Sequence, residues 1–423
     1  MTWIQRYRFH RLLSSSSWLV PLLAMVAAVV LHRLLWWLDT RTRWAWLDVS
    51  QNGARAIAGV IATSMLTFMV FTYSMLLLSV QIAGAQLSPR VIAMVMKDRV
   101  LKWCLGLFVF AFIYSASVLS RVEDVVPQLP MVMAGLGCAI SIAAFLYLVD
   151  YMMRTLRPAG IFGRVAAEAT AVIEDIYPHL LAEPERVRSE QASPPVGEPS
   201  RTVCYQGASG VLQAVDGRGL MQVARRNRCT IRLAQQVGDF VTKGEPLFHI
   251  YDGAQGVDDD ELYQSVAVGM ERTMQQDPTL AFRIIVDIAS RALSPAINDP
   301  STAVLALDQI HRLLRSVGKR YLGDGTIRDD EGLVRVILPT PNWEDFVSLG
   351  MSEIRLFGGS SLQIVRRLRA MIENLLAVLP EKRRPALHEQ LKLLDRAVER
   401  SFADPADRAY AGISDYQGVG GSR

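Results

Sequence analysis

The chain has 423 residues, of which 51% are hydrophobic and only 20% are charged, and its net charge is +4. A soluble domain usually keeps about a quarter of its residues charged, so this composition indicates a membrane protein with a sizeable water-exposed part. A disordered, collagen-like or disulfide-stapled chain is excluded, because apolar residues abound and there are only 4 cysteines.

The charges are divided unevenly along the chain. Residues 1–158 carry 14 Lys and Arg against 6 Asp and Glu, whereas the remaining residues carry 31 against 35. Arginines and amphipathic rings beside uncharged runs are typical of a bilayer interface, so this basic character predicts the lipid bilayer as a partner and gives no reason to propose nucleic acid. The basic part also holds seven of the eight tryptophans: Trp3, Trp18, Trp36, Trp37, Trp44, Trp46 and Trp103.

Four predominantly apolar stretches are long enough, or nearly so, to cross about 30 Å of hydrocarbon as helices. The first has His32 and Arg33 near its far end, where a long side chain reaches the interface. A secretory signal is the alternative interpretation of this stretch. No small-residue cleavage site precedes His32, so we expect an uncleaved anchor. The four stretches span residues 18–38, 56–87, 103–120 and 130–149.

The distribution of basic residues between the short loops predicts the orientation of these helices. Short cytoplasmic loops carry the excess of Lys and Arg, so we expect both termini in the cytoplasm and four passes through a bacterial inner membrane. In that reducing compartment, and without a CxxC pair, the four cysteines should be free thiols. The side of the N-terminus carries Arg6, Arg8, Arg11, Arg90, Lys97, Arg99, Lys102, Arg154, Arg157 and Arg164, against Arg41, Arg43, Arg55 and Arg121 on the other.

The second apolar stretch contains two rows of polar residues at seven-residue spacing, and residues seven apart fall on one stripe of a helix. Such side chains hydrogen-bond between packed helices, or they line a hydrated pathway. The presence of two rows on one helix indicates that one row packs on neighbouring helices and that the other contacts water. We expect the first row to line the pathway, with Arg90 and Lys97 at its cytoplasmic mouth attracting a small anion. The first row is Thr67, Ser74, Gln81 and Ser88, and the second is Thr72, Ser79 and Gln86.

Two further properties of the apolar stretches bear on function. No Asp, Glu, Lys or Arg lies near the middle of any of them, and this lack counts against a proton relay, which needs ionisable groups there. As a helix the second stretch would be about 48 Å long, so it must tilt, break or project from the bilayer.

The chain becomes water-exposed in character after the fourth stretch. Residues 159–201 predict a helix and a proline-rich flexible linker, and residues 202–255 predict a small β module of short, glycine-punctuated strands. The run GDFVTKGEPL at Gly238–Leu247 resembles the turn-strand pattern of biotinyl/lipoyl-type modules. Pro246–Glu271 contains no lysine that could carry such a group, so we expect the fold without a cofactor.

No motif supports an enzyme. The six histidines have no paired metal-ligand spacing, and no GxSxG, Walker A or dinucleotide fingerprint occurs. The acidic run Asp258–Glu261 lacks the glycine and spaced ligands of a calcium loop, so it is better interpreted as a solvated helix start. We therefore expect neither catalysis nor a bound metal.

The densest polar pattern lies between Glu271 and Leu314. Asp277-Pro278 and Asn298-Asp299-Pro300 each place a capping side chain before a proline, an arrangement that starts a helix. Two interpretations remain open. One is a pair of capped helices with a surface ion-pair ladder, and the other is a polar turn that binds an anion or a neighbouring subunit. On the first of these helices a charged stripe follows at intervals of four: Arg283, Asp287 and Arg291.

Four sequence blocks together resemble a known family. They are ERTxxQD at residues 271–277, VDIAxRALSPAINDPxTA at 286–303, QxxxxQLSPR ending at Arg90, and the run Ser352-Glu353-Ile354-Arg355. The resemblance spans nearly the whole chain and is to a bacterial family of predicted membrane proteins, domain of unknown function twenty-two fifty-four. It implies four N-terminal membrane helices and a cytoplasmic C-terminal half, and it supplies no catalytic residues.

The expected fold is an α-helical integral membrane protein with four N-terminal transmembrane helices, plus a mixed α/β, mainly helical cytoplasmic domain that contains the small biotinyl/lipoyl-like module. The transmembrane domain covers residues 1–158 and the helical cytoplasmic domain covers residues 256–403. The glycine-rich residues 404–423 are expected to form a disordered tail.

Two classes of function compete. The first is an oligomeric ion channel or pore with a cytoplasmic regulatory domain, and it needs a homo-oligomer because one four-helix chain cannot easily enclose a pathway. The second is a membrane-anchored sensor or scaffold whose cytoplasmic domain binds a ligand or a protein partner. A small secondary transporter comes third, because neither inverted repeats nor broken helices are visible. We favour the pore.

Overall fold

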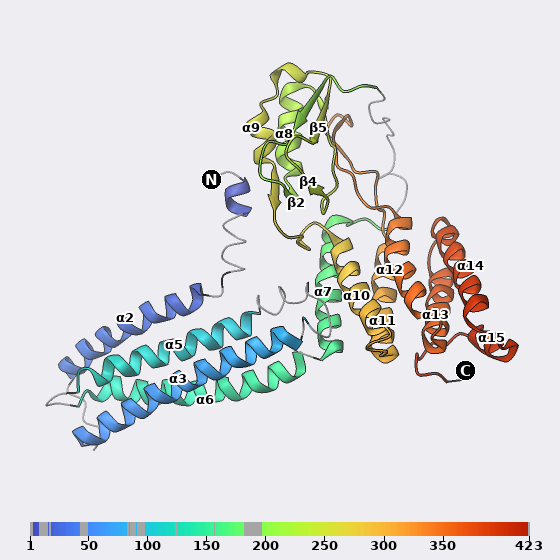
Figure 1. Cartoon of the computed structure of the whole chain (residues 1–423). Helices are drawn as coiled ribbons and strands as arrows, with labels where there is room; N and C mark the ends of the chain where they lie inside the picture. The colour runs from blue at the N-terminus through green and yellow to red at the C-terminus, as the bar shows by residue number, and fades with distance from the viewer. Residues whose placement is uncertain are drawn as a thin grey trace. The chain divides into compact units, whose positions relative to one another are not determined.

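The computed structural model describes residues 3–7, 16, 18–42, 50–82, 84, 90, 98–122, 126–155, 157–181 and 197–421. The chain forms two compact units (Figure 1). The N-terminal unit comprises residues 10–160, and the C-terminal unit comprises residues 161–423 together with residues 1–9.

Long apolar helices form the N-terminal unit. Each is long and apolar enough to cross a membrane, which confirms the four predicted stretches. α3 begins at Gln51, five residues before the predicted stretch. The prediction counted only residues suited to hydrocarbon, whereas polar residues outside the hydrocarbon can also be helical. The four helices are α2 (Leu19–Thr42), α3 (Gln51–Ile82), α5 (Arg99–Leu119) and α6 (Gln128–Thr155).

Contacts at one end of the N-terminal unit show how the helices run. The Asp39 carboxylate near the end of α2 accepts hydrogen bonds from the backbone N–H groups of Gln128 and Leu129 at the start of α6, at 3.2 and 3.0 Å. Arg55 Nε, near the start of α3, donates to the carbonyl of Val122 just after α5, at 2.8 Å. Successive helices therefore run in opposite directions, and α2 and α5 are parallel neighbours.

α5 is the central helix of the N-terminal unit. Half of its most apolar window is buried, against 11–22% for the other three helices. The ring of Phe108 on α5 packs near Phe68 of α3 and Phe145 of α6, with centroids 5.7 and 6.4 Å away. Because α3 contacts its neighbours on one side, the rest of its surface is exposed.

Two sheets lie in the C-terminal unit. The larger has the strand order β1-β5-β3-β8-β7, in which β3 and β8 are parallel and the other neighbours are antiparallel. The smaller is antiparallel, with the order β4-β2-β6. The strands are β1 (Arg201–Cys204), β2 (Gly210–Val215), β3 (Thr230–Leu233), β4 (Phe240–Val241), β5 (Pro246–Tyr251), β6 (Val266–Gly269), β7 (Thr326–Arg328) and β8 (Val334–Ile337).

The predicted β module is present in part and has additions from outside it. Gly238–Leu247 forms tight turns, with φ of 103° at Gly238 and 92° at Gly244, around the short strand β4 and into β5. A helix, α8 (Gly217–Asn227), lies between β2 and β3 in the sequence, and β7 and β8 come from beyond residue 320 to complete the larger sheet. The sheet is therefore not contained in residues 202–255.

The remainder of the C-terminal unit is helical and packs as neighbouring pairs. α10 contacts α11 and α12, α11 contacts α13, and α12 and α13 both contact α14. Short 3-10 segments, η3 and η4, cover Ala254–Gly256 and Glu381–Arg383. The helices are α7 (Pro158–Ile176), α8 (Gly217–Asn227), α9 (Asp259–Gln264), α10 (Pro278–Ala292), α11 (Pro300–Gly318), α12 (Trp343–Gly358), α13 (Leu362–Val378), α14 (Arg384–Ser401) and α15 (Pro405–Ala411).

The prediction of a disordered tail at residues 404–423 is wrong for its described part, which ends at residue 421. α15 forms there, and the segment after it is attached to α13 by the fully buried Arg366, which donates to the carbonyls of Ile413, Gly420 and Gly421. Asp415 accepts hydrogen bonds from three backbone N–H groups of the same segment. Long-range bonds to one arginine thus order a glycine-rich sequence.

Candidate functional site

The two polar rows of α3 lie on different sides of the helix. Thr67, Ser74 and Gln81 are exposed, whereas Thr72 and Ser79 are each only 1% exposed and pack inside the unit. At about 100° per residue, the centres of the two rows are about 150° apart. The second row therefore meets helices of its own chain, and the first row points away from the bundle.

The hydroxyls of the exposed row are hydrogen-bonded to their own helix. Thr67 Oγ1 donates to the carbonyl of Thr63 at 3.0 Å, and Ser74 Oγ donates to that of Val70 at 2.9 Å. Such bonds use the hydroxyl proton and leave the oxygen lone pairs for an external donor or cation. By itself this row presents hydrogen-bond acceptors, which bind water and cations better than anions. The small anion that we expected Arg90 and Lys97 to attract is therefore not favoured by the row itself.

The other residues predicted at the cytoplasmic end of this row are only partly described. Arg90 is helical and exposed, while Ser88 and Lys97 lie outside the described residues, as does Gln86 of the second row. The prediction of a charged mouth therefore stays a prediction.

The residues grouped with the predicted polar turn of the C-terminal unit do not all lie together. Asp277 precedes the start of α10, whereas Asn298 and Asp299 follow its end. A helix of 15 residues is about 22 Å long, so it holds these groups far apart. The two groups are close in sequence, which suggested one site. Each of them starts a helix, however, and α10 separates them in space.

Both predicted helix caps are confirmed. Asp277 Oδ1 accepts hydrogen bonds from the backbone N–H groups of Thr279 and Leu280, at 3.1 and 3.3 Å. Asp299 Oδ1 accepts one from Thr302 N–H at 3.1 Å, and Asn298 before it has a left-handed φ of 47°. These carboxylates fill the helix N-termini that an anion would otherwise occupy.

The charged stripe of α10 forms a bridge between helices. Arg283 Nε donates to Asp287 at 2.6 Å, and its Nη atoms contact both oxygens of Glu353 on α12, one of them at 2.7 Å. The hydrogen bonds from Arg283 hold the pKa of Glu353 below its usual range. Arg283 is therefore engaged within the fold, which leaves it no role as a free anion receptor.

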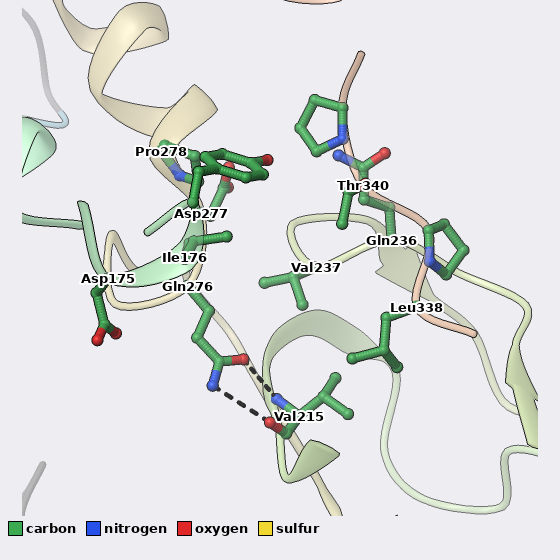
Figure 2. Close-up of a pocket in the computed structure, with 13 residues that line it drawn as sticks. Asp175, Ile176, Val215, Gln236, Val237, Gln276, Asp277, Pro278, Leu338 and Thr340 are labelled. Atoms are coloured by element: carbon green, nitrogen blue, oxygen red, sulfur yellow. Dashed lines mark hydrogen bonds between the residues drawn. The ribbon is translucent and has the colours of Figure 1, made fainter. Parts of the chain in front are cut away.

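The block ERTxxQD, residues 271–277, links the smaller sheet to the start of α10. Gln276 pairs with the backbone of Val215 on β2, accepting from its N–H at 2.8 Å and donating to its carbonyl at 3.2 Å (Figure 2). Gln213 Nε2, also on β2, donates to the carbonyl of Glu271 at 2.6 Å. Arg272 donates to Asp277 Oδ2 through Nε and Nη2, at 3.0 and 2.7 Å.

Gly238 is required by this junction for two reasons. Its φ of 103° is rare for residues with a side chain. A Cβ at this position would also overlap Arg272 Nη2 and lie 2.7 Å from Asp277 Oδ2. The glycine of the GDFVTKGEPL run and the ion pair of the ERTxxQD block therefore depend on each other.

A cavity of about 210 Å³ adjoins the junction (Figure 2). Burial, and then the nearby Asp277, raise the pKa of Tyr177 to about 12, so its hydroxyl stays neutral at physiological pH. Mostly apolar walls with a few polar groups, among them the Asp175 and Asp277 carboxylates, suit a small, weakly polar molecule. The lining residues are Asp175, Ile176, Tyr177, Val215, Gln236, Val237, Gln276, Asp277, Pro278, Leu338, Pro339, Thr340 and Pro341.

Sequence reasoning missed this cavity. Its walls come from the end of α7, β2, the loop before β4, the start of α10 and the loop before α12, which are distant in sequence. The one local signal was the run Leu338-Pro339-Thr340-Pro341, whose two prolines hold an extended segment. A wider hollow of about 740 Å³ shares Ile176, Tyr177, Leu338 and Thr340 with it.

Comparison with known proteins identifies similar chains. The family described as "Predicted membrane protein (DUF2254)" matches residues 14–374. The uncharacterized protein Rv1290c of Mycobacterium tuberculosis (strain H37Rv) and the uncharacterized protein Mb1321c of Mycobacterium bovis are each 30% identical over 372 residues. Each alignment covers 84% of this chain and 70% of the relative. No solved structure matches the chain.

Proposed function

The chain belongs to the DUF2254 family of predicted membrane proteins, and on that premise we propose that it forms a homo-oligomeric ion pore lined by α3. The observation that carries the proposal is the outward-facing row of Thr67, Ser74 and Gln81 on a helix long and apolar enough to cross a membrane. Polar side chains on the outside of such a helix favour contact with water or with another polar surface over contact with lipid.

The position of the row requires several copies around an axis. The row faces away from the bundle of its own chain, so only α3 helices of other copies can place similar rows around a common pathway. The exposed Thr63 and the half-buried Gly59, which has open space where a Cβ would lie, continue this side and let neighbouring helices approach closely. A closed ring of identical chains satisfies both conditions.

The chemistry of the row predicts weak selectivity. Hydroxyl oxygens that already donate to their own helix replace part of an ion's hydration shell without holding the ion tightly. The acceptor character of the row favours cations, and the basic residues predicted at the mouth favour anions. The reversal potential in a salt gradient distinguishes these contributions.

The proposed setting is a bacterial inner membrane with both termini in the cytoplasm. The excess of basic residues on the side of the N-terminus supports this orientation. The C-terminal unit is then available to regulate the pore from the cytoplasm.

Conductance of the purified protein in a planar bilayer tests the proposal. Ser74→Leu should abolish the conductance, because an apolar side chain removes water from the pathway. Tyr73→Leu is the matched control, since Tyr73 is also exposed on α3 but lies about 100° around the helix, and its conductance should persist. Equal currents for wild type and Ser74→Leu would overturn the assignment, as would a monomeric mass in mild detergent at every concentration.

A membrane-anchored sensor is the second candidate, favoured by the cavity beside Tyr177 and Asp277. In that function the cavity binds a small ligand, and the β module serves as a platform without a carried cofactor. A screen of small, weakly polar molecules for thermal stabilisation of the full chain tests it. Val237→Trp, which fills the cavity, should abolish any stabilisation, and stabilisation that survives this change would place the ligand elsewhere.

A further inference from the structure

The N-terminal unit contains a buried polar pair that the proposed pore does not use. His32 on α2 is 3% exposed and Tyr114 on α5 is 1% exposed. Their rings meet edge to face, with centroids 5.8 Å apart. Among the described residues, the two ring nitrogens of His32 have no hydrogen-bond partner, and the Tyr114 hydroxyl has none either.

Polar groups continue from this pair to one end of the bundle. His32, Trp36 and Asp39 follow at helical spacing on one face of α2. The Arg121 guanidinium lies 5.4 Å from the Trp36 ring centroid, and Asp39 accepts hydrogen bonds from the start of α6. His32 is only four residues from Trp36, which places it about 6 Å deeper in the bundle.

Burial of these groups without a partner in the described part of the chain needs a physical explanation. A buried polar atom that lacks a hydrogen bond costs free energy, and in native proteins such atoms are usually satisfied by internal water. An ionisable group inside a membrane bundle is costly and is retained chiefly for function. Histidine is also the side chain whose charge ordinarily changes between pH 5 and 8.

We propose that His32 and Tyr114 form a hydrated proton-binding site inside the N-terminal unit, reached from the end at Asp39 and Arg121. A hydronium ion in the adjoining water transfers its proton to the free lone pair of the imidazole and becomes water, leaving the imidazolium hydrogen-bonded to water and to the Tyr114 oxygen. No other reactant is required. The site does not depend on the pore, because it lies between α2 and α5 and not on the exposed row of α3.

The charges around the pair set its response to pH. The charged groups nearest to the pair are Arg121, in the turn after α5, and Asp39, seven residues further along α2. Arg33, next to His32, is exposed on another face of α2, and the start of α6 contributes the backbone N–H groups that hold Asp39. Protonation therefore adds a positive charge near Arg121 and strengthens the attraction towards Asp39, which joins α2 to α6.

The expectation drawn from sequence against a proton relay counted only Asp, Glu, Lys and Arg, and it placed His32 near the membrane surface. The structure shows the imidazole buried between helices of the bundle. The side of the helix on which a histidine lies is decided by packing, and α5 covers this one.

Nuclear magnetic resonance of the full-length protein in lipid bilayers, labelled with 15N at histidine, tests the proposal. The spectrum of His32→Gln identifies the His32 ring signals by their loss. Between pH 8 and 5 we expect these signals to change reversibly from the neutral to the charged imidazole pattern and to receive magnetisation from water. Signals that stay neutral at pH 5 while free imidazole in the same sample titrates, or that receive no magnetisation from water, would overturn the proposal.

Tyr114→Phe tests the pairing separately. Loss of the hydroxyl should move the His32 titration midpoint by a measurable fraction of a pH unit, because the imidazolium loses an acceptor. An unchanged midpoint in a folded Tyr114→Phe protein would exclude Tyr114 from the site. If this variant does not fold, the wild-type titration and the magnetisation transfer still decide whether His32 binds a proton.

Discussion

The candidate polar residues of the two units differ in whether they have partners inside their own unit. In the C-terminal unit Asp277, Asp299 and Arg283, which the sequence marks as candidate binding groups, are all engaged by helix N-termini or carboxylates of the same unit. In the N-terminal unit His32 and Tyr114 are buried without partners among the described residues. When all the hydrogen-bonding groups of a polar side chain have partners within the unit, the fold alone explains its presence. A buried polar side chain without such partners indicates that water, a proton or another chain binds there.

The exposed row of α3 lies between these extremes. The hydroxyls of Thr67 and Ser74 donate to their own helix, so lipid contact would not leave these two donors unsatisfied. Their acceptor oxygens and the Gln81 amide still face outward. Substitutions test this difference between the units. Some remove polar groups that have hydrogen-bond partners and others remove groups that lack them, and the measurements are of stability and of transport.

The largest effect on stability is expected at the junction of the C-terminal unit. Gly238→Ala should destabilise it by about 2–4 kcal/mol, because the new Cβ is strained and displaces the Arg272–Asp277 ion pair. Gly244→Ala is the matched control, since Gly244 has a similar φ of 92° but no atom near the position of a Cβ. Hydrogen exchange of β2 and α10 measures both, and equal losses would show that the ion pair does not constrain Gly238.

Loss of a single cap should cost less. Asp299→Ala removes the acceptor for Thr302 N–H and should destabilise the first turn of α11 by about 0.5–2 kcal/mol. Asp299→Asn keeps a capping oxygen and should retain most of the stability. Amide exchange in the first turn of α11 reports the difference, and identical protection in the two variants would contradict the capping role.

In the N-terminal unit, removal of a hydroxyl that has no hydrogen-bond partner should increase stability rather than decrease it. Thr72 Oγ1 is buried with no partner among the described residues, so Thr72→Val should stabilise the bundle by about 1 kcal/mol. Ser79→Ala should give no such gain, because Ser79 Oγ donates to the carbonyl of Met75 at 2.7 Å. Thermal unfolding in detergent compares them, and a destabilised Thr72→Val protein would reveal a partner for this hydroxyl.

The smallest effect concerns pH. Burial lowers the pKa of His311, whose Nε2 lies 2.8 Å from Asn374 Oδ1. The folded state then binds fewer protons than the unfolded state below about pH 6.5, so stability is full above that pH and is lost as the pH falls. One proton limits the slope to about 1.4 kcal/mol per pH unit. Urea unfolding of His311→Gln between pH 7.5 and 5.5 should show a flatter dependence than wild type, and an unchanged slope would exclude His311 as a cause.

Much of the fold could be predicted from the sequence because it depends on local chemistry. Apolar length identified the four long helices, and a carboxylate before a proline identified the starts of α10 and α11. The same reasoning could not find the parallel pairing of β3 with β8, about a hundred residues away, or the order that Arg366 imposes on the tail. These depend on contacts between distant residues.

The candidate sites were less predictable for the same reason. Seven-residue spacing identified two polar rows on α3, but only the packing of α5 and α6 decides that Thr72 and Ser79 are inside and Ser74 is outside. The cavity beside Tyr177 is assembled from five separate segments. A single sequence contains no record of either arrangement.

The central claim is that the exposed row of α3 faces a water-filled path in the assembled protein. Accessibility of single cysteines measures this directly, in a background where Cys104, Cys138, Cys204 and Cys229 are replaced by serine or alanine. In reconstituted liposomes, Ser74→Cys should react rapidly with a charged, membrane-impermeant thiol reagent. Tyr73→Cys, exposed on α3 but about 100° around the helix from Ser74, should react slowly because lipid covers it. Equal protection of the two positions would contradict the claim.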